Sequence, residues 1–144
     1  LDAERAGLVL VCHEAAEPDR ALTRTLTLAG VPHLVIRTEP ERAVVGPFVI
    51  PGAGPCVGCT DLVRRDLDPA FPHLLAQLCR ATHIPLPRQA AWAAGLACSQ
   101  VAAWCAGQRL QSLGATLELD AHTGAVGTRL WPRHPDCPCA LVHG

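Results

Sequence analysis

Alternating runs of apolar and polar residues predict a β-α-β unit in the first third of the chain. Gly7–Cys12 is a continuous apolar run, which is typical of a buried strand in a parallel sheet. Apolar residues then recur at helical spacing, with Asp19 placed to cap the helix and Gly30 placed to end it. A second apolar, β-branched run occupies residues 31–39. A helix between two such strands favours a parallel crossover.

The middle of the chain predicts a third strand and two helices. Arg42–Gly52 reads as a strand, and Pro47 within it predicts a sheet edge or a β-bulge because proline cannot donate to a ladder. Residues 68–82 predict a short helix, and the prolines that follow predict an extended loop. Gln89–Gly107 is rich in alanine and carries no charge, which predicts a helix buried on both sides. Too few large aliphatic residues occur there for a membrane span.

The last third predicts an antiparallel hairpin followed by an irregular tail. Residues 115–120 alternate between apolar and polar and predict a first strand, and residues 121–124 supply a turn. Residues 125–131 then predict the second strand of the hairpin. The proline-rich remainder has no regular pattern. We therefore expect an α/β fold in one domain over residues 1–144, a partial Rossmann-like β-α-β sheet with a buried alanine-rich helix and a C-terminal hairpin.

Composition narrows the functional classes. The formal net charge is −1, which argues against a nucleic-acid partner held by bulk charge. The basic residues are all arginine, so a P-loop lysine, a Schiff-base lysine and a lysine general base are excluded from this chain. The amino-terminal end has no signal-peptide pattern, and the expected location is the cytoplasm.

Two close cysteine pairs stand out among the eight cysteines. Cys56 and Cys59 lie in a glycine-rich turn, and Cys137 and Cys139 lie in the proline-rich tail. Four thiolates from two such knuckles suit tetrahedral zinc at a closed, structural site, although the second pair has a single spacer residue. A metal ion here would also fix the irregular tail to the body of the protein.

Other interpretations of these pairs stay open on sequence alone. Cys56 and Cys59 could form a thioredoxin-type dithiol, disulfides could link one knuckle to the other, or all four could be buried free thiols. His134 is an alternative ligand or a residue that supports the ligands. We expect the four remaining cysteines to be core residues, although Cys12 ends a strand where ligands often gather. They are Cys12, Cys79, Cys98 and Cys105.

The acidic and basic residues of 61–68 have spacings that suit a helix. Asp61, Arg64, Arg65, Asp66 and Asp68 can pair three or four residues apart on its surface. We expect a solvated face or local ion pairs.

The segment "VVGPFVIPGAGPCVGCTDL", together with the late "HPDCPC", resembles the ThiF/E1-like superfamily. The longer segment at 31–78 is similar to the actinobacterial ThiF-like partner proteins of azole-forming peptide biosynthesis. The resemblance implies a zinc tetrathiolate formed by Cys56, Cys59, Cys137 and Cys139, and a homodimer. It also implies a non-catalytic role, in which the protein binds or presents a precursor peptide to a YcaO-type partner.

Departures from the family pattern concern the ATP site. Catalytic members carry a glycine-rich G-x-G-x-x-G turn and a "D.TDN" motif after a strand. This chain has no such turn, and "VCHEAAEPD" places Ala15 at the asparagine position and offers Glu14 as one acid. We therefore expect no ATP binding and no catalysis by this chain alone. The alternatives are part of an adenylyltransferase whose ATP site lies upstream of Leu1, and a free-standing zinc-binding interaction module.

Overall fold

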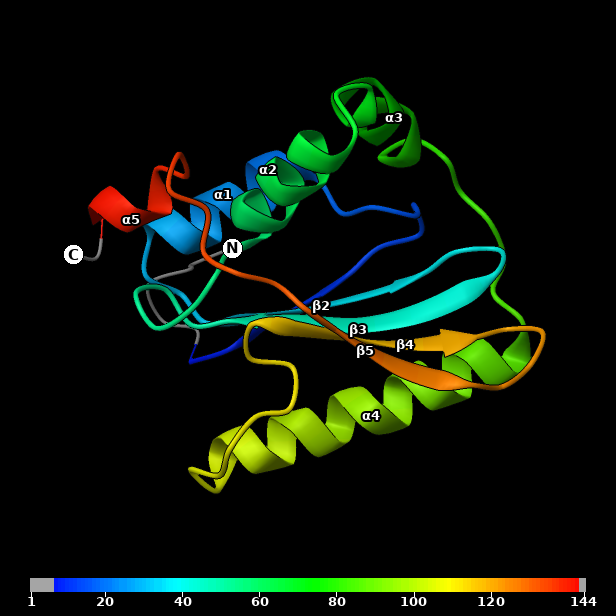
Figure 1. Ribbon diagram of the computed structural model, residues 1–144. Helices are drawn as coiled ribbons and strands as arrows, with labels where there is room; N and C mark the ends of the chain where they lie inside the picture. The colour runs from blue at the N-terminus through cyan, green and yellow to red at the C-terminus, as the bar shows by residue number, and fades with distance from the viewer. Residues whose placement is uncertain (1–6, 143–144) are drawn as a thin grey trace.

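The computed structural model describes residues 7–142, so the ends of the predicted 1–144 domain, with Leu1, lie outside it. A five-stranded sheet lies between helices on its two sides (Figure 1). The strands are β1 (Val9–Cys12), β2 (His33–Thr38), β3 (Arg42–Val49), β4 (Ala115–Asp120) and β5 (Val126–Leu130). The helices are α1 (Arg20–Leu28), α2 (Val57–Leu67), α3 (Phe71–Leu78), α4 (Pro87–Cys105) and α5 (Cys139–Val142).

The sheet is mixed, with strand order β1-β2-β3-β4-β5. β1 and β2 are parallel and joined through α1, which confirms the predicted β-α-β unit, and every other neighbouring pair is antiparallel. Helix α4 covers one face of the sheet, and the other four helices lie on the opposite side (Figure 1). The core on the α4 side includes Leu34 and Phe48, and the core on the other side includes Val35, Val49 and Cys59.

The ends of α1 follow the sequence prediction. The Asp19 carboxylate accepts a hydrogen bond from the backbone N–H of Ala21, so it satisfies a donor that the first helical turn leaves free. Gly30 adopts a φ of 72° just past the helix and lets the chain turn into β2.

The prediction of a sheet edge at Pro47 is wrong, and the alternative of a bulge is confirmed. β3 is the central strand and pairs with both β2 and β4. The β2–β3 register shifts at Gly46 and Pro47, where β3 carries one extra residue. Gly46 has a φ of 110°, and a β-carbon there would lie 2.4 Å from the carbonyl oxygen of Ala115. Only glycine fits at this close approach of β3 to the start of β4.

The alanine-rich helix is not buried on both sides. In α4 the buried residues fall on one face, and they are Gln89, Ala93, Ala97 and Gln100. The opposite face is exposed, including Cys98 and Cys105, which were expected in the core. The reason is that one sheet covers only one side of a helix. Among the described residues, no helix is long and apolar enough to cross a bilayer.

The remaining cysteine predictions also need correction. Cys12 is exposed at the end of β1, where its side chain lies on the α4 face of the sheet and lines an open cavity beside that helix. Cys79 is half-buried, and its thiol lies 3.6 Å from the carbonyl oxygen of Pro18.

Candidate metal centre

The first cysteine knuckle connects the central strand to a helix. β3 ends at Val49, a turn follows, and Cys56 is the N-cap of α2. The carbonyl oxygen of Cys56 accepts the N–H of Cys59 at 3.0 Å, so the first helical turn places both sulfurs on one side. Gly58 lies between them, and a β-carbon there would be 3.4 Å from the Cys137 sulfur. A larger residue would therefore press on the sulfur cluster.

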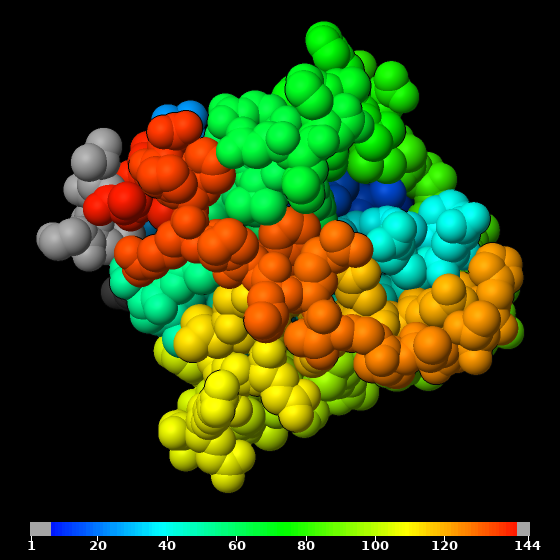
Figure 2. All heavy atoms as spheres, viewed as in Figure 1, coloured from blue at the N-terminus to red at the C-terminus, as the bar shows by residue number. Residues whose placement is uncertain are grey.

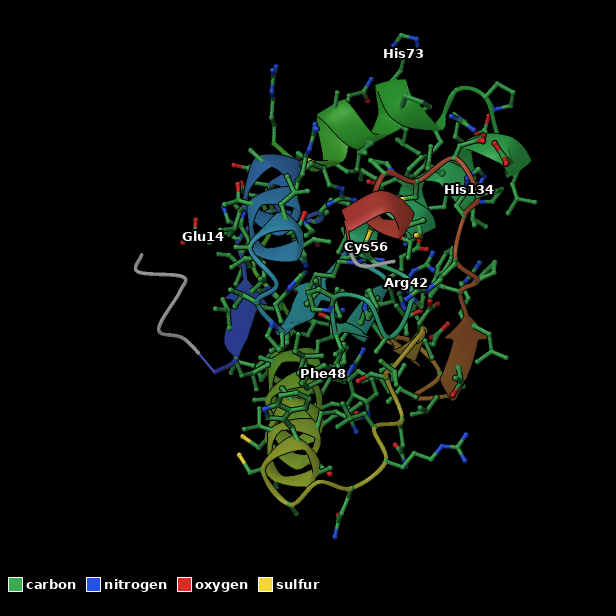
Figure 3. The ribbon with its side chains drawn as sticks, turned by 90° about the vertical axis from the view of Figure 1, so that its left-hand side faces the viewer. Glu14, Arg42, Phe48, Cys56, His73 and His134 are labelled. Carbon is green, nitrogen blue, oxygen red and sulfur yellow. The ribbon has the colours of Figure 1, made fainter. Side chains whose placement is uncertain are left out.

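The second knuckle is supplied by the C-terminal tail. After β5 the tail runs back over the surface, past α2, to the short helix α5 (Figures 1 and 2). The N–H of Cys137 donates to the carbonyl oxygen of His134 at 3.0 Å, and the N–H of Ala140 donates to that of Cys137 at 3.2 Å. These tight turns bring Cys137 and Cys139 against the first knuckle. Figure 3 shows Cys56 beside α5.

The four sulfurs form one compact group. Cys56 Sγ lies 3.9 Å from Cys59 Sγ and 3.5 Å from Cys137 Sγ, and Cys59 Sγ lies 3.5 Å from Cys139 Sγ. All four sulfurs lie within 4.8 Å of one another. A tetrahedron with metal–sulfur bonds of about 2.3 Å has sulfur–sulfur edges of about 3.8 Å. The donor set therefore fits one tetrahedral, thiophilic metal ion.

The thiol pKa values show how close these groups are. The hydrogen bond from the Cys56 thiol, together with backbone N–H groups of Cys56 and His134, lowers the pKa of Cys59 to about 4 despite burial. The same sulfur–sulfur hydrogen bond raises the pKa of Cys56. Burial, followed by the neighbouring thiols, raises the pKa of Cys139 to about 12. Without a cation the raised pKa values keep Cys56 and Cys139 protonated beside a Cys59 thiolate, and a metal ion would displace those protons.

His134 supports the cluster but is not one of its ligands. Its ring is buried, with Nδ1 accepting the N–H of Asp136 at 3.1 Å and Nε2 lying 2.8 Å from Asp66 Oδ2. Because Nδ1 accepts, Nε2 carries the proton and donates to the carboxylate. Both ring nitrogens are therefore engaged away from the sulfurs, while the backbone of His134 contacts Cys59 and Cys137.

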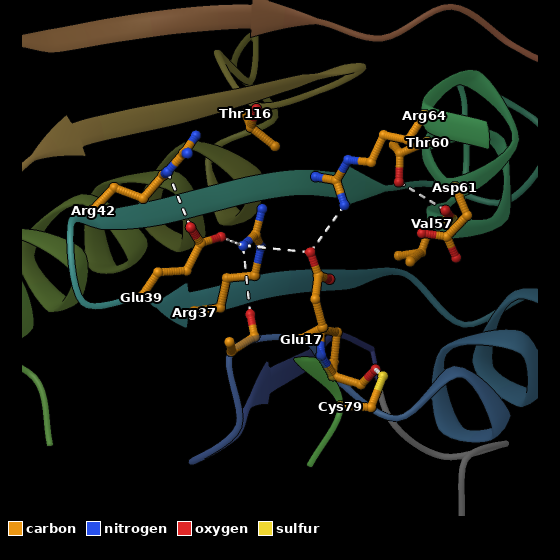
Figure 4. Close-up of polar contacts among 12 residues, drawn as sticks. Glu17, Arg37, Glu39, Arg42, Val57, Thr60, Asp61, Arg64, Cys79 and Thr116 are labelled. Carbon is orange, nitrogen blue, oxygen red and sulfur yellow. Dashed lines mark hydrogen bonds and ion pairs between the residues drawn. The ribbon is translucent and has the colours of Figure 1, made fainter. Parts of the chain in front are cut away.

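A buried ion cluster fixes α2, and with it the first knuckle, to the segment after β1 (Figure 4). Its centre is Glu17, which is 4% exposed. Its carboxylate lies 2.9 Å from Arg64, 2.8 Å from Arg20 and 3.4 Å from Arg37. Burial alone would raise the pKa of Glu17, but the three guanidinium groups hold it below its ordinary value.

Two further contacts extend this cluster. Arg20 forms a bidentate pair with Asp61, at 2.7 and 2.9 Å. The Arg64 guanidinium lies over the rings of Phe71 and Trp131, with its central carbon 5.4 and 4.9 Å from the ring centroids. Arg64 thus ties α2 to α3 and to the start of the tail.

The prediction of local pairing within residues 61–68 is wrong in detail. Asp61 and Arg64 reach across to Arg20 and Glu17, in the loop after β1 and the first turn of α1. Arg65 and Asp66 pair with each other as adjacent residues. Spacing along a helix gave no sign of these partners, because the partners are 41 and 47 residues away in sequence.

The sequence predicted the four cysteines as one site, and the structure brings them together. It did not single out Glu17 or Arg37 as the buried charges that hold the site's helix. A partial signal was present, since an acid with two alanines before it and a proline after it follows an apolar strand. His33 was also missed: it is fully buried in β2, and its Nε2 has no partner among the described residues.

Comparison with known proteins gives a fold but no sequence family. No family model and no curated protein matches the chain. The structure of E. coli MccB superposes with a TM-score of 0.72 at 19% identity, covering 96% of this chain and 40% of MccB. The structure of E. coli MccB with selenomethionine-labelled MccA superposes with a TM-score of 0.70 at 18% identity, covering 96% of this chain and 39% of MccB. The heterocyclase TruD superposes with a TM-score of 0.71 at 18% identity, covering 93% of this chain and 22% of TruD.

These identities are low, so they establish the fold alone. The chain spans about two fifths of the length of the MccB chains it matches. The likeness extends over the sheet, its helices and the cysteine-bearing tail, because it covers nearly the whole chain. The chain therefore has the fold of one part of MccB and of one part of TruD.

Proposed function

We propose that this chain is a zinc-stabilised, non-catalytic E1-like scaffold. It binds or presents a precursor peptide to a YcaO-type partner in ribosomal peptide natural-product biosynthesis, as in the actinobacterial ThiF-like partner proteins. The observation that carries this proposal is the fold shared with MccB and TruD. MccB is a microcin C7 biosynthetic enzyme whose structures include complexes with MccA, and TruD is a heterocyclase.

Zinc is the ion proposed for the four-sulfur group. Structural zinc takes four thiolates in a closed tetrahedron, and the sulfur–sulfur distances of 3.5 to 3.9 Å suit that geometry. Cys56, Cys59, Cys137 and Cys139 would hold it. The ion would supply no chemistry, because a closed site leaves no open position for substrate. Its role is to clip the tail to α2.

The sequence predicts no catalysis by this chain alone. It has no G-x-G-x-x-G turn and no lysine, and Ala15 follows Glu14 where catalytic relatives carry an acid and an asparagine. The test is binding of ATP with magnesium, followed by pyrophosphate exchange with a precursor peptide. We expect neither activity. Size-exclusion chromatography with the precursor peptide and the YcaO-type protein should instead yield a complex. Exchange activity, or no complex with either partner, would contradict the proposal.

A second candidate is part of an ATP-dependent adenylyltransferase whose nucleotide site lies upstream of Leu1. It is favoured by the solved complex of E. coli MccB with ATP, which shares this fold at a TM-score of 0.70. A third is a free-standing zinc-binding interaction module, which would bind zinc but neither precursor nor YcaO-type partner. For each we propose a cytoplasmic location and a homodimer without nucleic acid. A monomer in light scattering would contradict the dimer.

A further inference from the structure

A small cavity lies in the interior of the domain, between the sheet and α2. Its volume is about 10 Å³, which is about the space that one water molecule needs. Its walls come from β2, the β3 bulge, the start of β4, α2 and the segment after β1. Every wall residue except Arg64 is buried, so the cavity belongs to the core and not to an outer surface of the domain.

Two guanidinium groups on the walls carry hydrogen-bond donors that no described residue accepts. The Nη1 atoms of Arg37 and Arg64 both contact Glu17, at 3.4 and 2.9 Å. Their Nε and Nη2 atoms form no hydrogen bond with any residue from 7 to 142. Figure 4 shows one terminal nitrogen of each group pointing into the space between Arg37, Arg64 and Thr116, which all line the cavity. The Arg37 side chain is only 7% exposed, so its free donors face the cavity rather than bulk water.

The hydroxyl groups on the walls are already engaged. Thr116 Oγ1 donates to Glu118 at 2.9 Å and accepts the indole N–H of Trp131 at 3.1 Å. Thr60 Oγ1 donates to a carbonyl oxygen one turn earlier in α2, at 2.8 Å. Glu17 is the one carboxylate among the wall residues. The free guanidinium donors therefore need an acceptor that the walls themselves do not supply.

The ion pairs around the cavity form one network with an excess of positive charge. Within the described part of the chain, its members are Arg20, Arg37, Arg42, Arg64 and Arg129, with Glu17, Glu39, Asp61 and Glu118. Five guanidinium groups, which stay charged, and four carboxylates give the network a formal charge of +1. A buried cation without a counter-charge is costly. Three of the arginines share Glu17, so the excess is greatest beside the cavity that Glu17 lines.

The pKa of Arg64 reflects this excess. Burial lowers the pKa of the Arg64 guanidinium and the nearby Arg37 lowers it further, although Glu17 acts in the opposite direction. The carboxylate that Arg64 binds therefore does not fully compensate its charge. An anion in the cavity would lie next to the free terminal nitrogen of Arg64, and hydrogen bonds from a charged donor to an anion are stronger than those between neutral groups.

We propose that the cavity binds one small monatomic anion, chloride, between the guanidinium groups of Arg37 and Arg64. The anion accepts hydrogen bonds from both free terminal nitrogens and cancels the formal charge of the network. Sulfate, phosphate and gluconate are excluded, because the cavity has room for about one water-sized particle. The bound ion holds α2, which carries Cys56 and Cys59, against β2 and the β3 bulge. This site is independent of the proposed peptide-binding function.

The test is the chloride dependence of stability, measured by urea unfolding at constant ionic strength with sodium gluconate replacing sodium chloride. At a chloride concentration of about ten times the dissociation constant, the equilibrium constant for folding should be about elevenfold higher than in gluconate alone. Arg64→Lys keeps a charge for Glu17 but removes the second terminal nitrogen, so it should abolish this dependence. Arg42→Lys is the matched control, because Arg42 belongs to the same network but does not line the cavity, and it should keep the full dependence.

A crystal structure tests the site directly and does not depend on the folding of Arg64→Lys. Crystals of the unaltered chain grown in sodium chloride should give an anomalous chlorine peak between Arg37 and Arg64 when measured with long-wavelength X-rays. Density there without an anomalous signal would identify a water molecule and overturn the inference. Chloride dependence that is absent from the unaltered chain, or equal in Arg64→Lys and Arg42→Lys, would also overturn it, and would leave the proposed function standing.

Discussion

Replacing Glu17 by glutamine tests the buried ion cluster beneath α2. Among the described residues, Arg64 forms an ion pair with Glu17 alone, whereas Arg20 keeps Asp61 and Arg37 keeps Glu39. Removing one partner of a buried pair costs about 3 to 5 kcal/mol. Because two of the three arginines retain a carboxylate, and glutamine keeps an accepting oxygen, we expect the lower end of that range, about 3 kcal/mol.

That loss corresponds to a large shift in melting temperature. An unfolding entropy of about 2.1 cal/mol/K per residue over the 144 residues gives about 3 °C per kcal/mol, so Tm should fall by about 10 °C. The assay is urea and thermal unfolding followed by circular dichroism. Glu41→Gln is the matched control, because its exposed side chain has no partner among the described residues, and it should change stability by less than about 0.5 kcal/mol.

The acid dependence gives a second check on the same residue. The folded-state pKa of Glu17 lies below its ordinary value of 4.5, so its stabilisation is present above pH 4.5 and lost as pH falls through the folded pKa. The gap between wild type and Glu17→Gln should therefore narrow in acid. The double variant Glu17→Gln/Arg64→Met should recover part of the loss. A loss below about 1 kcal/mol, with no coupling to Arg64, would refute the reasoning.

Further predictions concern the sheet. Gly46→Ala should lower the free energy of unfolding in urea by about 3 kcal/mol or more, because the new β-carbon would meet the Ala115 carbonyl oxygen. Gly127→Ala is the control: its β-carbon would meet nothing within 4 Å, and it should cost less than about 1 kcal/mol. Equal losses for the two variants would contradict the role of the bulge. Burial lowers the folded-state pKa of His33, so stability should fall as pH drops below about 6.5, where the unfolded chain binds a proton that the fold excludes. His33→Leu should flatten this dependence in urea midpoints measured from pH 8 to 5.5, and an unchanged slope would refute it.

Local patterns in the sequence predicted the features that depend on neighbouring residues. The β-α-β unit, the Asp19 cap and the hairpin each follow from periodicity and turn chemistry within a few residues. The cysteine pairs were recognisable because each knuckle is contiguous in sequence.

Features that depend on distant segments were missed or misjudged. Pro47 was consistent with an edge or a bulge, and only the late strand β4, which pairs beside it, makes β3 central. An uncharged helix predicts burial on all sides. Because the sheet covers only one face of α4, Cys98 on the other face is exposed. Glu17 found its partners through tertiary contacts as far away as Arg64, which no local pattern reveals.

The central claim is that a metal ion holds the tail to α2 through four cysteines. Purified protein should contain about one zinc per chain by mass spectrometry of the metal, and Cys56→Ser or Cys139→Ser should lose it along with thermal stability. Cys105→Ser, an exposed cysteine outside the cluster, should keep both. Folded protein without zinc, with Cys56 and Cys59 joined in a disulfide, would contradict the account.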